Sequence, residues 1–245
     1  MCGRYTLSVG HEALARAFLA EFAEEVKASW QSRYNIAPGG GITAILEDRD
    51  KKRRRAEILH WGLVPAWADD PNIGYKLINA RAETVATKPS FRNPFRYRRC
   101  LVPASGFFEW DRQQKPRQPY FFHPREADFL AFAGVWEHWQ HPDGSEILSA
   151  AVLTTAADEV MAPIHHRMPV ILPESAWALW LDTGNVKAQM PVFLEAHAEA
   201  PPLACHPVSS AVNKATVDGP ELIEPVDPVE DASPPARQRD QMELF

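Results

Sequence analysis

Long hydrophobic runs are missing from this chain of 245 residues. No apolar stretch approaches the roughly 18 residues that a membrane-spanning helix needs. The first ten residues, MCGRYTLSVG, also lack the basic and then apolar pattern of a secretory signal. Three cysteines, an odd number in a long chain, do not suit a disulfide framework and fit a reducing compartment. We therefore expect a soluble, cytoplasmic, monomeric protein with no membrane contact.

Metal and nucleotide motifs are absent as well. The sequence contains no GxGxxG, no P-loop and no HExxH, and Cys100 and Cys205 lack CxxC partners. We therefore expect neither a metal ion nor a cofactor. No internal repeat or internal linker is visible, so the body of the chain is predicted to form one domain.

The negative charge is concentrated at one end. The formal net charge is −6, and residues 221–245 carry −5 of it, which leaves −1 for residues 1–220. The tail is also rich in proline and has no periodic apolar pattern, so we expect it to be disordered. We therefore predict one folded domain over residues 1–220, followed by this tail. Because that domain is nearly neutral, the overall charge does not exclude a nucleic-acid partner.

Two basic stretches stand out in the body. KKRRR, at 51–55, is typical of a solvated hairpin tip. KPSFRNPFRYRR, at 88–99, interleaves bases with three aromatic residues, a mix that grooves for single-stranded nucleic acid use to attract phosphates and stack bases. The alternative is a loop whose aromatic side chains fix it to the core.

The apolar pattern predicts an α+β fold. Leu14, Phe18 and Phe22 favour one amphipathic helix over residues 11–22, and helical patterns return at 174–181 and 185–190. Pro142-Asp143-Gly144 is typical of a hairpin turn. This density of strands indicates a mostly antiparallel, curved, barrel-like sheet flanked by short helices. Strand-like runs cover 41–47, 57–64, 99–104, 106–111, 120–123, 129–137, 147–155, 168–172 and 203–209.

The second residue carries the most distinctive chemistry. Aminopeptidases remove an initiator Met that precedes a small residue, so the mature chain is expected to begin with Cys2. An N-terminal cysteine is a 1,2-aminothiol whose α-amine has a pKa of about 7.7–8.0. The amine can condense with an aldehyde to an imine, and the thiol can then close a thiazolidine ring. The same group can instead serve as a nucleophile for acyl transfer, or its position can be incidental.

Three further segments contain candidate site residues. Asn79 and Arg81 lie on one side of the chain if it is extended, although a capped helix start is equally compatible. Glu109 lies in an apolar, aromatic strand, either as a partnered structural residue or as an acid or base with a raised pKa. His165, with His166 and Arg167 beside it, is suited to proton transfer near neutral pH.

Together these segments resemble the SRAP (SOS response-associated peptidase) family, whose members bind abasic sites in single-stranded DNA and cross-link to them. The resemblance runs from residue 1 to about 210. The pieces that carry it are MCGRYT, RYNIAP, WGLVPAW, LINARAET, KPSF, RCLVPASGFFEW, VLTTAA and IHHRMPVIL.

The resemblance implies a role for particular residues. It places the nucleophile at Cys2, the site amide at Asn79, the carboxylate at Glu109 and the histidine at His165. It also implies that several residues face DNA, and we assign such contacts to Arg4, Pro38, Trp61, Arg81, Arg92 and Arg167. The expected product is a thiazolidine between Cys2 and an abasic-site aldehyde. A thiol peptidase or autopeptidase and a non-catalytic DNA-binding module remain the alternatives.

The last five residues, QMELF, resemble the peptide with which bacterial proteins bind the replicative sliding clamp. Leu244 and Phe245 would fill an apolar pocket, Gln241 would begin the motif, and the tail would serve as a tether. A frayed terminus is the alternative. If the source is bacterial, we expect association with the nucleoid.

Overall fold

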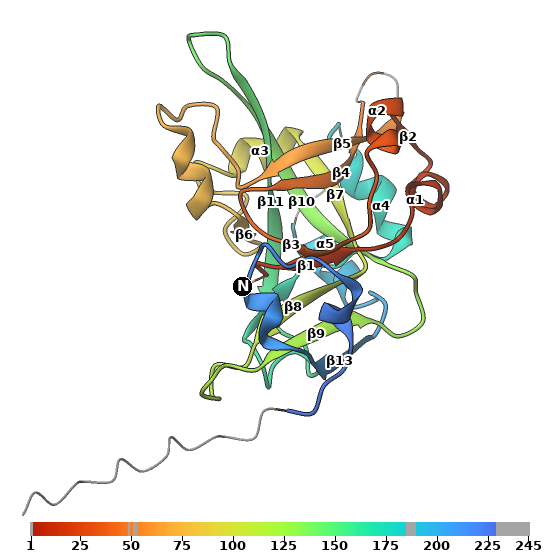
Figure 1. Ribbon diagram of the computed structural model, residues 1–245. Helices are drawn as coiled ribbons and strands as arrows, with labels where there is room; N and C mark the ends of the chain where they lie inside the picture. Colours follow the sequence, from red (N-terminus) through yellow and green to blue (C-terminus); the bar gives the residue numbers. More distant parts are fainter. Residues whose placement is uncertain (1, 49, 51–52, 185–189, 229–245) are drawn as a thin grey trace, which may run out of the picture.

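Five strands close into a barrel in the computed structural model, which describes residues 2–48, 50, 53–184 and 190–228. Neighbouring barrel strands are antiparallel except β11 and β5, which run parallel and close the ring. The barrel occupies the upper part of Figure 1. Its strands are β4 (Gly41–Glu47), β5 (Arg54–Trp61), β7 (Arg99–Ala104), β10 (Leu130–Gln140) and β11 (Glu146–Ala156).

A second sheet, antiparallel throughout, lies below the barrel in Figure 1. Its order is β13 (Leu203–Pro207), β9 (Pro119–Pro124), β8 (Gly106–Trp110), β1 (Tyr5–Leu7) and β3 (Arg33–Ile36). Tyr5 and Phe107 join the two sheets, because the rings of both contact Phe132 of β10 edge to face. Three short strands extend the barrel: β2 (Ala20–Phe22), β6 (Asn79–Arg81) and β12 (Arg167–Pro169).

Short helices flank these sheets. Arg99 is buried and donates hydrogen bonds to the carbonyl oxygens of Phe95, Trp180 and Asp182, so it joins α3 to the end of α4. None of the helices in the described ranges is long and apolar enough to cross a membrane. They are α1 (His11–Phe18), α2 (Glu24–Ala28), α3 (Arg92–Tyr97), α4 (Glu174–Leu181), α5 (Met190–His197) and the 3₁₀ helices η1 (Pro71–Lys76), η2 (Ser210–Asn213) and η3 (Pro220–Ile223).

The predicted α+β class with a curved, barrel-like sheet is confirmed. β4, β7 and α4 have the predicted bounds. The turn at 142–144 joins β10 to β11, with Gly144 at φ 90°. The predicted helix over 11–22 is wrong beyond Phe18, because Leu19 adopts the left-handed conformation and residues 20–22 pair with β5 instead.

Two other predictions need adjustment. Within the stretch at 88–99, residues 92–97 form the helix α3 rather than a loop. Phe91 and Phe95 are buried, so aromatic side chains do fix the segment to the core, and Arg92 is exposed. Ordered contacts continue past the predicted boundary at 220, since Leu222 is fully buried and the Val226 N–H bonds the Pro207 carbonyl. The predicted disorder of residues 229–245 lies outside the described residues, and so do residues 185–189 of the predicted helix at 185–190.

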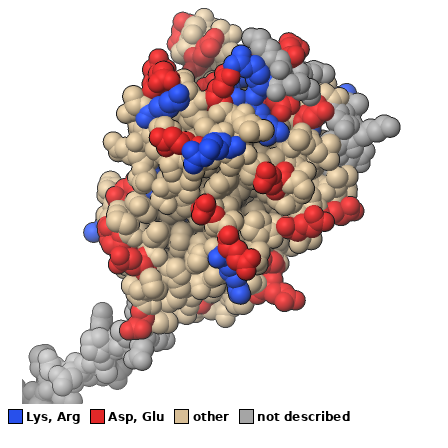
Figure 2. All heavy atoms as spheres, turned by 90° about the vertical axis from the view of Figure 1, so that its right-hand side faces the viewer, with Lys and Arg blue, Asp and Glu red and all other residues tan. Residues whose placement is uncertain are grey.

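The face that carries α1, α2 and α4 mixes both signs of charge. Acidic and basic side chains are interspersed over its described part and the basic ones form no continuous patch (Figure 2). The basic residues of the 51–55 stretch that can be described are paired: Arg53 with Glu21, Arg54 with Glu47, and Arg55 with Glu57. This face is therefore poorly suited to following a chain of phosphates.

Candidate active site

The N-terminal segment runs along strand β8. β1 pairs with β8 so that Tyr5 is opposite Phe107, and the Arg4 carbonyl accepts the Phe108 N–H at 2.9 Å. This register places residues 2–4 beside the part of β8 that contains Glu109. The Cys2 side chain is fully buried.

Asn79 fixes the main chain of Cys2. It begins β6, which lies parallel to β11 with Asn79 opposite Val152. Its Nδ2 donates a hydrogen bond to the Cys2 carbonyl oxygen at 2.8 Å. Its Oδ1 is buried and accepts no hydrogen bond from any residue that the structure describes. The amide thus holds Cys2 and leaves one acceptor available beside it.

Glu109 links Cys2 to His165 electrostatically. Burial raises the pKa of the Cys2 thiol far above its ordinary value, and the negative charge of Glu109 raises it further. Burial lowers the pKa of His165, and the charge of Glu109 opposes that shift. Because one buried carboxylate acts on both groups, Cys2, Glu109 and His165 form a single cluster.

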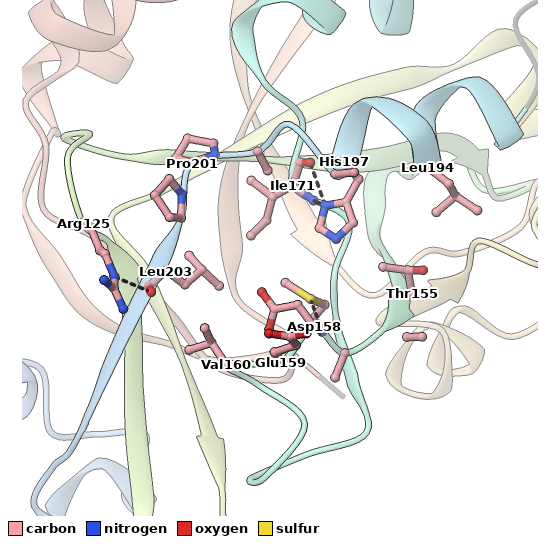
Figure 3. Close-up of a pocket in the computed structure, with 16 residues that line it drawn as sticks. Arg125, Thr155, Asp158, Glu159, Val160, Ile171, Leu194, His197, Pro201 and Leu203 are labelled. Carbon is pink, nitrogen blue, oxygen red and sulfur yellow. Dashed lines mark hydrogen bonds between the residues drawn. The ribbon is translucent and has the colours of Figure 1, made fainter.

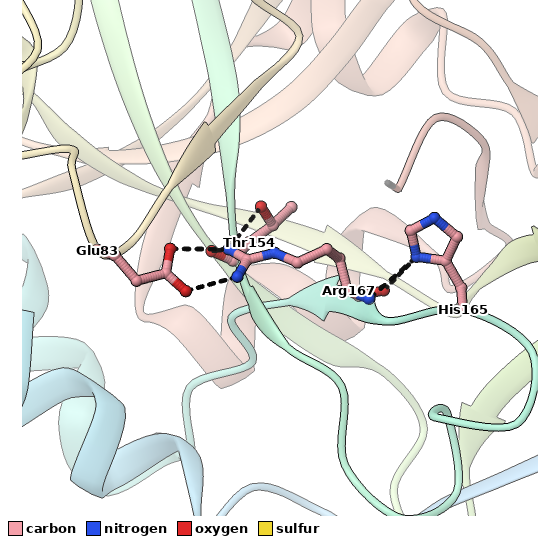
Figure 4. Close-up of polar contacts among 4 residues, drawn as sticks. All are labelled: Glu83, Thr154, His165 and Arg167. Atoms are coloured by element: carbon pink, nitrogen blue, oxygen red, sulfur yellow. Dashed lines mark hydrogen bonds and ion pairs between the residues drawn. The ribbon is translucent and has the colours of Figure 1, made fainter.

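His165 lies just before β12 and is 3% exposed. Its Nδ1 lies 3.0 Å from the backbone nitrogen of Arg167 and 3.1 Å from the carbonyl oxygen of the same residue (Figure 4). The two contacts correspond to the two neutral tautomers, because Nδ1 accepts from the N–H in one and donates to the carbonyl in the other. His166 stacks on this ring with centroids 4.5 Å apart.

The side chain of Arg167 is also held in place, by Glu83 and Thr154. Its guanidinium donates to both carboxylate oxygens of Glu83, at 2.5 and 2.9 Å, and to the Thr154 carbonyl at 2.6 Å. Figure 4 shows the carboxylate facing the two terminal nitrogens while the other end of the residue meets His165. The pair lowers the pKa of Glu83.

This cluster is equipped for proton transfer around a buried thiol. At neutral pH the thiol of Cys2 holds its proton, whereas His165 is neutral and can take one up. Glu109 supplies a negative charge that stabilises the imidazolium so formed. In the described ranges no group of three or more His, Cys, Asp or Glu side chains is arranged to hold a metal ion.

The residues predicted to contact DNA differ in how accessible their side chains are. Arg81 and Arg92 are exposed, and Pro38 is half-buried in the turn between β3 and β4. Arg4 donates from one nitrogen to Asn35 Oδ1 at 2.6 Å and to the Val212 carbonyl at 2.7 Å, and Arg167 is engaged by Glu83.

Trp61 belongs to the core. Its ring is fully buried and packs edge to face on Tyr5, and its Nε1 donates to the Ile78 carbonyl at 3.0 Å. The Trp61 side chain is therefore not available for base stacking in this conformation. The remaining DNA contacts stay predictions.

A cavity of about 620 Å³ borders strand β12, and none of the predicted site residues lines it (Figure 3). Met168, the residue after Arg167 in β12, is part of its wall, together with Ile171 and Leu194. Its polar groups include Asp158 and the His197 ring, whose Nδ1 contacts the backbone of Ile171. The mixed lining does not select one class of ligand.

A model of the family described as SOS response associated peptidase (SRAP) matches residues 1–215. The chain belongs to this family. It is 38% identical over 226 residues to "Abasic site processing protein YoqW" of Bacillus subtilis (strain 168), covering 91% of this chain and 99% of that protein. It is 32% identical over 265 residues to "Abasic site processing protein HMCES" of Gallus gallus, covering 93% and 78% respectively.

Solved structures share the fold of this SRAP chain. A crystal structure of a protein from Bacteroides thetaiotaomicron aligns with a TM-score of 0.79 at 22% identity and covers 92% of this chain and 100% of that one. A protein from Bordetella bronchiseptica aligns with a TM-score of 0.68 at 24% identity, covering 85% and 100%. At these identities the likeness concerns the fold alone.

Sequence reasoning missed two residues of the SRAP site region. Asn35, in RYNIAP, accepts from Arg4 and donates to the carbonyls of Lys214 and Val217, so it joins the N-terminus to the end of the domain. Glu83, in LINARAET, holds Arg167. Both lie within motifs already noted, but their partners are distant in sequence.

Proposed function

We propose that this SRAP chain binds single-stranded DNA and joins covalently to abasic sites through Cys2. The observation that carries the proposal is the environment of Cys2, whose carbonyl is held by Asn79 and whose thiol shares the charge of Glu109 with His165. The names of the bacterial and avian relatives point to the same substrate.

The chemistry needs Met1 to be removed so that Cys2 carries the terminal amine. An abasic sugar in its open form presents an aldehyde at C1′. The amine adds to that carbon, and loss of one water gives an imine. Sγ of Cys2 then adds to the imine carbon while the thiol proton passes to the nitrogen, which closes a thiazolidine. One aldehyde and one aminothiol are consumed, and one water is released.

The surrounding residues take the following parts in this scheme. Neutral His165, assisted by the charge of Glu109, carries protons to and from the reacting atoms. Asn79 holds the Cys2 backbone so that amine and thiol meet the same carbon. The amine acts first, because the buried thiol is protonated at neutral pH and gains nucleophilicity only when a base takes its proton. Arg81 and Arg92, both exposed, attract the phosphates.

A denaturing gel tests the proposal. The protein is incubated with a single-stranded oligonucleotide that contains one abasic site and is then heated in denaturant. We expect a shifted band from the wild type and from Cys205→Ala, which removes the exposed cysteine of β13, and none from Cys2→Ala. An equal band from Cys2→Ala would exclude the mechanism.

Self-processing is a second use of the same residues. If Cys2 and His165 remove Met1 by acyl transfer, intact mass spectrometry will find Met1 retained in Glu109→Ala and His165→Ala. We expect Met1 to be lost in both variants, because the protonated, buried thiol is a poor nucleophile for an amide. Retention of Met1 would favour the autopeptidase.

The C-terminal peptide with Gln241, Leu244 and Phe245 lies outside the described residues. We keep the proposal that it binds the sliding clamp if the source is bacterial. Deletion of residues 241–245 is expected to abolish binding to purified clamp and to leave cross-linking unchanged. Equal clamp binding by the full and the shortened chains would rule it out.

A further inference from the structure

Glu83 binds the guanidinium group of Arg167. Both of its carboxylate oxygens accept from the guanidinium, and Thr154 accepts as well. The Arg167 side chain is 13% exposed, so this ion pair is shielded from solvent on the arginine's side. Because Thr154 belongs to β11 and Glu83 follows β6, the pair fixes Arg167 to two neighbouring strands.

The backbone N–H and the carbonyl oxygen of Arg167 both lie within hydrogen-bond distance of Nδ1 of His165. When Nδ1 accepts from the Arg167 N–H at 3.0 Å, the ring proton is on Nε2, and Nε2 can donate it. When Nδ1 donates to the Arg167 carbonyl at 3.1 Å, Nε2 is a proton acceptor. The ring can therefore act as an acid or as a base without rotating, provided that the backbone of Arg167 stays in place.

We propose that Glu83 is a positioning residue for the cross-linking reaction: it anchors the Arg167 side chain and so fixes the backbone groups that let His165 both give and take a proton. The inference rests on the proposed function, and it adds a residue that touches neither the sugar nor Cys2. The reaction needs this double capacity, since the leaving water takes up a proton during imine formation and the thiol must lose one during ring closure.

Other charged groups also act on His165. Glu109 lies on β8 and Arg112 just after it, the N-terminal amino group contributes a positive charge, and His166 stacks on the ring. Replacing Glu83 by Gln leaves all of these unchanged and leaves the charge of Arg167 without its counter-ion. Protonation of His165 then becomes less favourable, so its pKa falls.

Nuclear magnetic resonance of the DNA-free protein tests the positioning directly. Two-bond ¹H–¹⁵N correlations report which ring nitrogen of His165 carries the proton, and a pH series gives the midpoint. In Glu83→Gln we expect a midpoint at lower pH and loss of the Nδ1 hydrogen-bond shift. The control is Glu57→Gln, which removes a carboxylate paired with Arg55 on the barrel strand β5. An unchanged His165 spectrum in Glu83→Gln would overturn the proposal.

Kinetics give the second readout. At saturating abasic single-stranded DNA, Glu83→Gln is expected to lower the first-order rate of cross-linking roughly tenfold, Glu83→Asp to restore part of it, and Glu57→Gln to match the wild type. Affinity for an oligonucleotide with a non-reactive tetrahydrofuran site should stay within about twofold, since Glu83 does not contact DNA in this proposal.

The other possible results of these experiments distinguish the proposal from its alternatives. An unchanged rate in Glu83→Gln overturns the proposal, and tighter DNA binding at an unchanged rate shows instead that Glu83 only competes with phosphate for Arg167. If the wild type forms no cross-link, the proposed function fails, while the resonance spectra still decide whether Glu83 positions His165. A melting temperature close to that of the wild type confirms that Glu83→Gln is folded.

Discussion

The Asn79 side chain offers a hydrogen-bond donor and an acceptor beside Cys2. A substitution at this position tests what they contribute to cross-linking. Asn79→Ala removes the hydrogen bond to the Cys2 carbonyl and the buried Oδ1. We expect the cross-linking rate to fall by about 10- to 100-fold, because the nucleophile is no longer held in position. Asn213→Ala is the control, since Asn213 is exposed and its Oδ1 accepts from the Trp110 ring nitrogen, away from Cys2. A wild-type rate in Asn79→Ala, measured by quenched-gel kinetics, would contradict this role.

His165 should make the stability of the protein sensitive to acid. Burial lowers its pKa below 6.5, so between the folded and unfolded pKa values the unfolded chain binds more protons than the folded one. The free energy of unfolding therefore rises with pH through this window and declines as pH falls below about 6.5.

Urea unfolding at a series of pH values measures this dependence. Burial also lowers the pKa of His60, so His165→Gln should weaken the loss of stability in acid without removing it. The same slope in His165→Gln and in the wild type would show that His165 does not titrate differently in the two states.

The candidate site residues were proposed from the sequence, but their proximity in the fold could not be predicted from it. Cys2, Glu109 and His165 stand in motifs of the family, whereas the pairings β1–β8 and β11–β12 that place them together join distant segments. Glu83 had no visible role because its partner Arg167 lies far along the chain. Trp61 was expected at the DNA surface, yet burial of its large ring contributes to the core instead.

Helix α1 ends at an unusual residue. Leu19 is left-handed at φ 50° and 80% exposed, so its side chain contributes little packing while its backbone is strained. Leu19→Gly should raise the free energy of unfolding by about 0.5–1 kcal/mol, since glycine adopts this conformation without strain. Leu19→Ala keeps the strain and should be nearly neutral. Destabilisation by Leu19→Gly in urea unfolding would contradict this reading.

Local patterns predicted elements well where the local signal and the packing agree. β4 and β7 are bounded by turn residues, and both have the predicted limits. Residues 20–22 looked helical because Phe22 continues the spacing of Leu14 and Phe18, but pairing with β5 prevails there. The parallel pairing of β11 with β5, which closes the barrel, has no local signature and was not predictable.

For the whole molecule, the structure places the end of the packed domain beyond 220. Leu222 is fully buried and the backbone of Val226 bonds that of Pro207. Deleting residues 220–245 should lower the free energy of unfolding by about 2–4 kcal/mol, comparable to removing a buried leucine. Deleting only 229–245, whose composition predicts disorder, should change it by less than about 0.5 kcal/mol. Equal stability of the two truncated chains in urea would place the boundary back at 220.

The charge of the whole molecule is a poor guide to its partner. Most of the net −6 comes from residues 221–245, and the described face bearing α1 and α4 mixes both signs. Exposed bases on other elements, Arg81 of β6 and Arg92 of α3, are the candidates for phosphate contact. We therefore expect Arg92→Glu to weaken binding of any single-stranded DNA and to reduce its salt dependence.

The intact mass of the adduct shows whether Cys2 closes a thiazolidine on an abasic site. We expect the mass of the chain without Met1 plus that of the oligonucleotide minus one water, unchanged after treatment with borohydride. An adduct that retains Met1, or one that gains two hydrogens on reduction as an imine does, would contradict it.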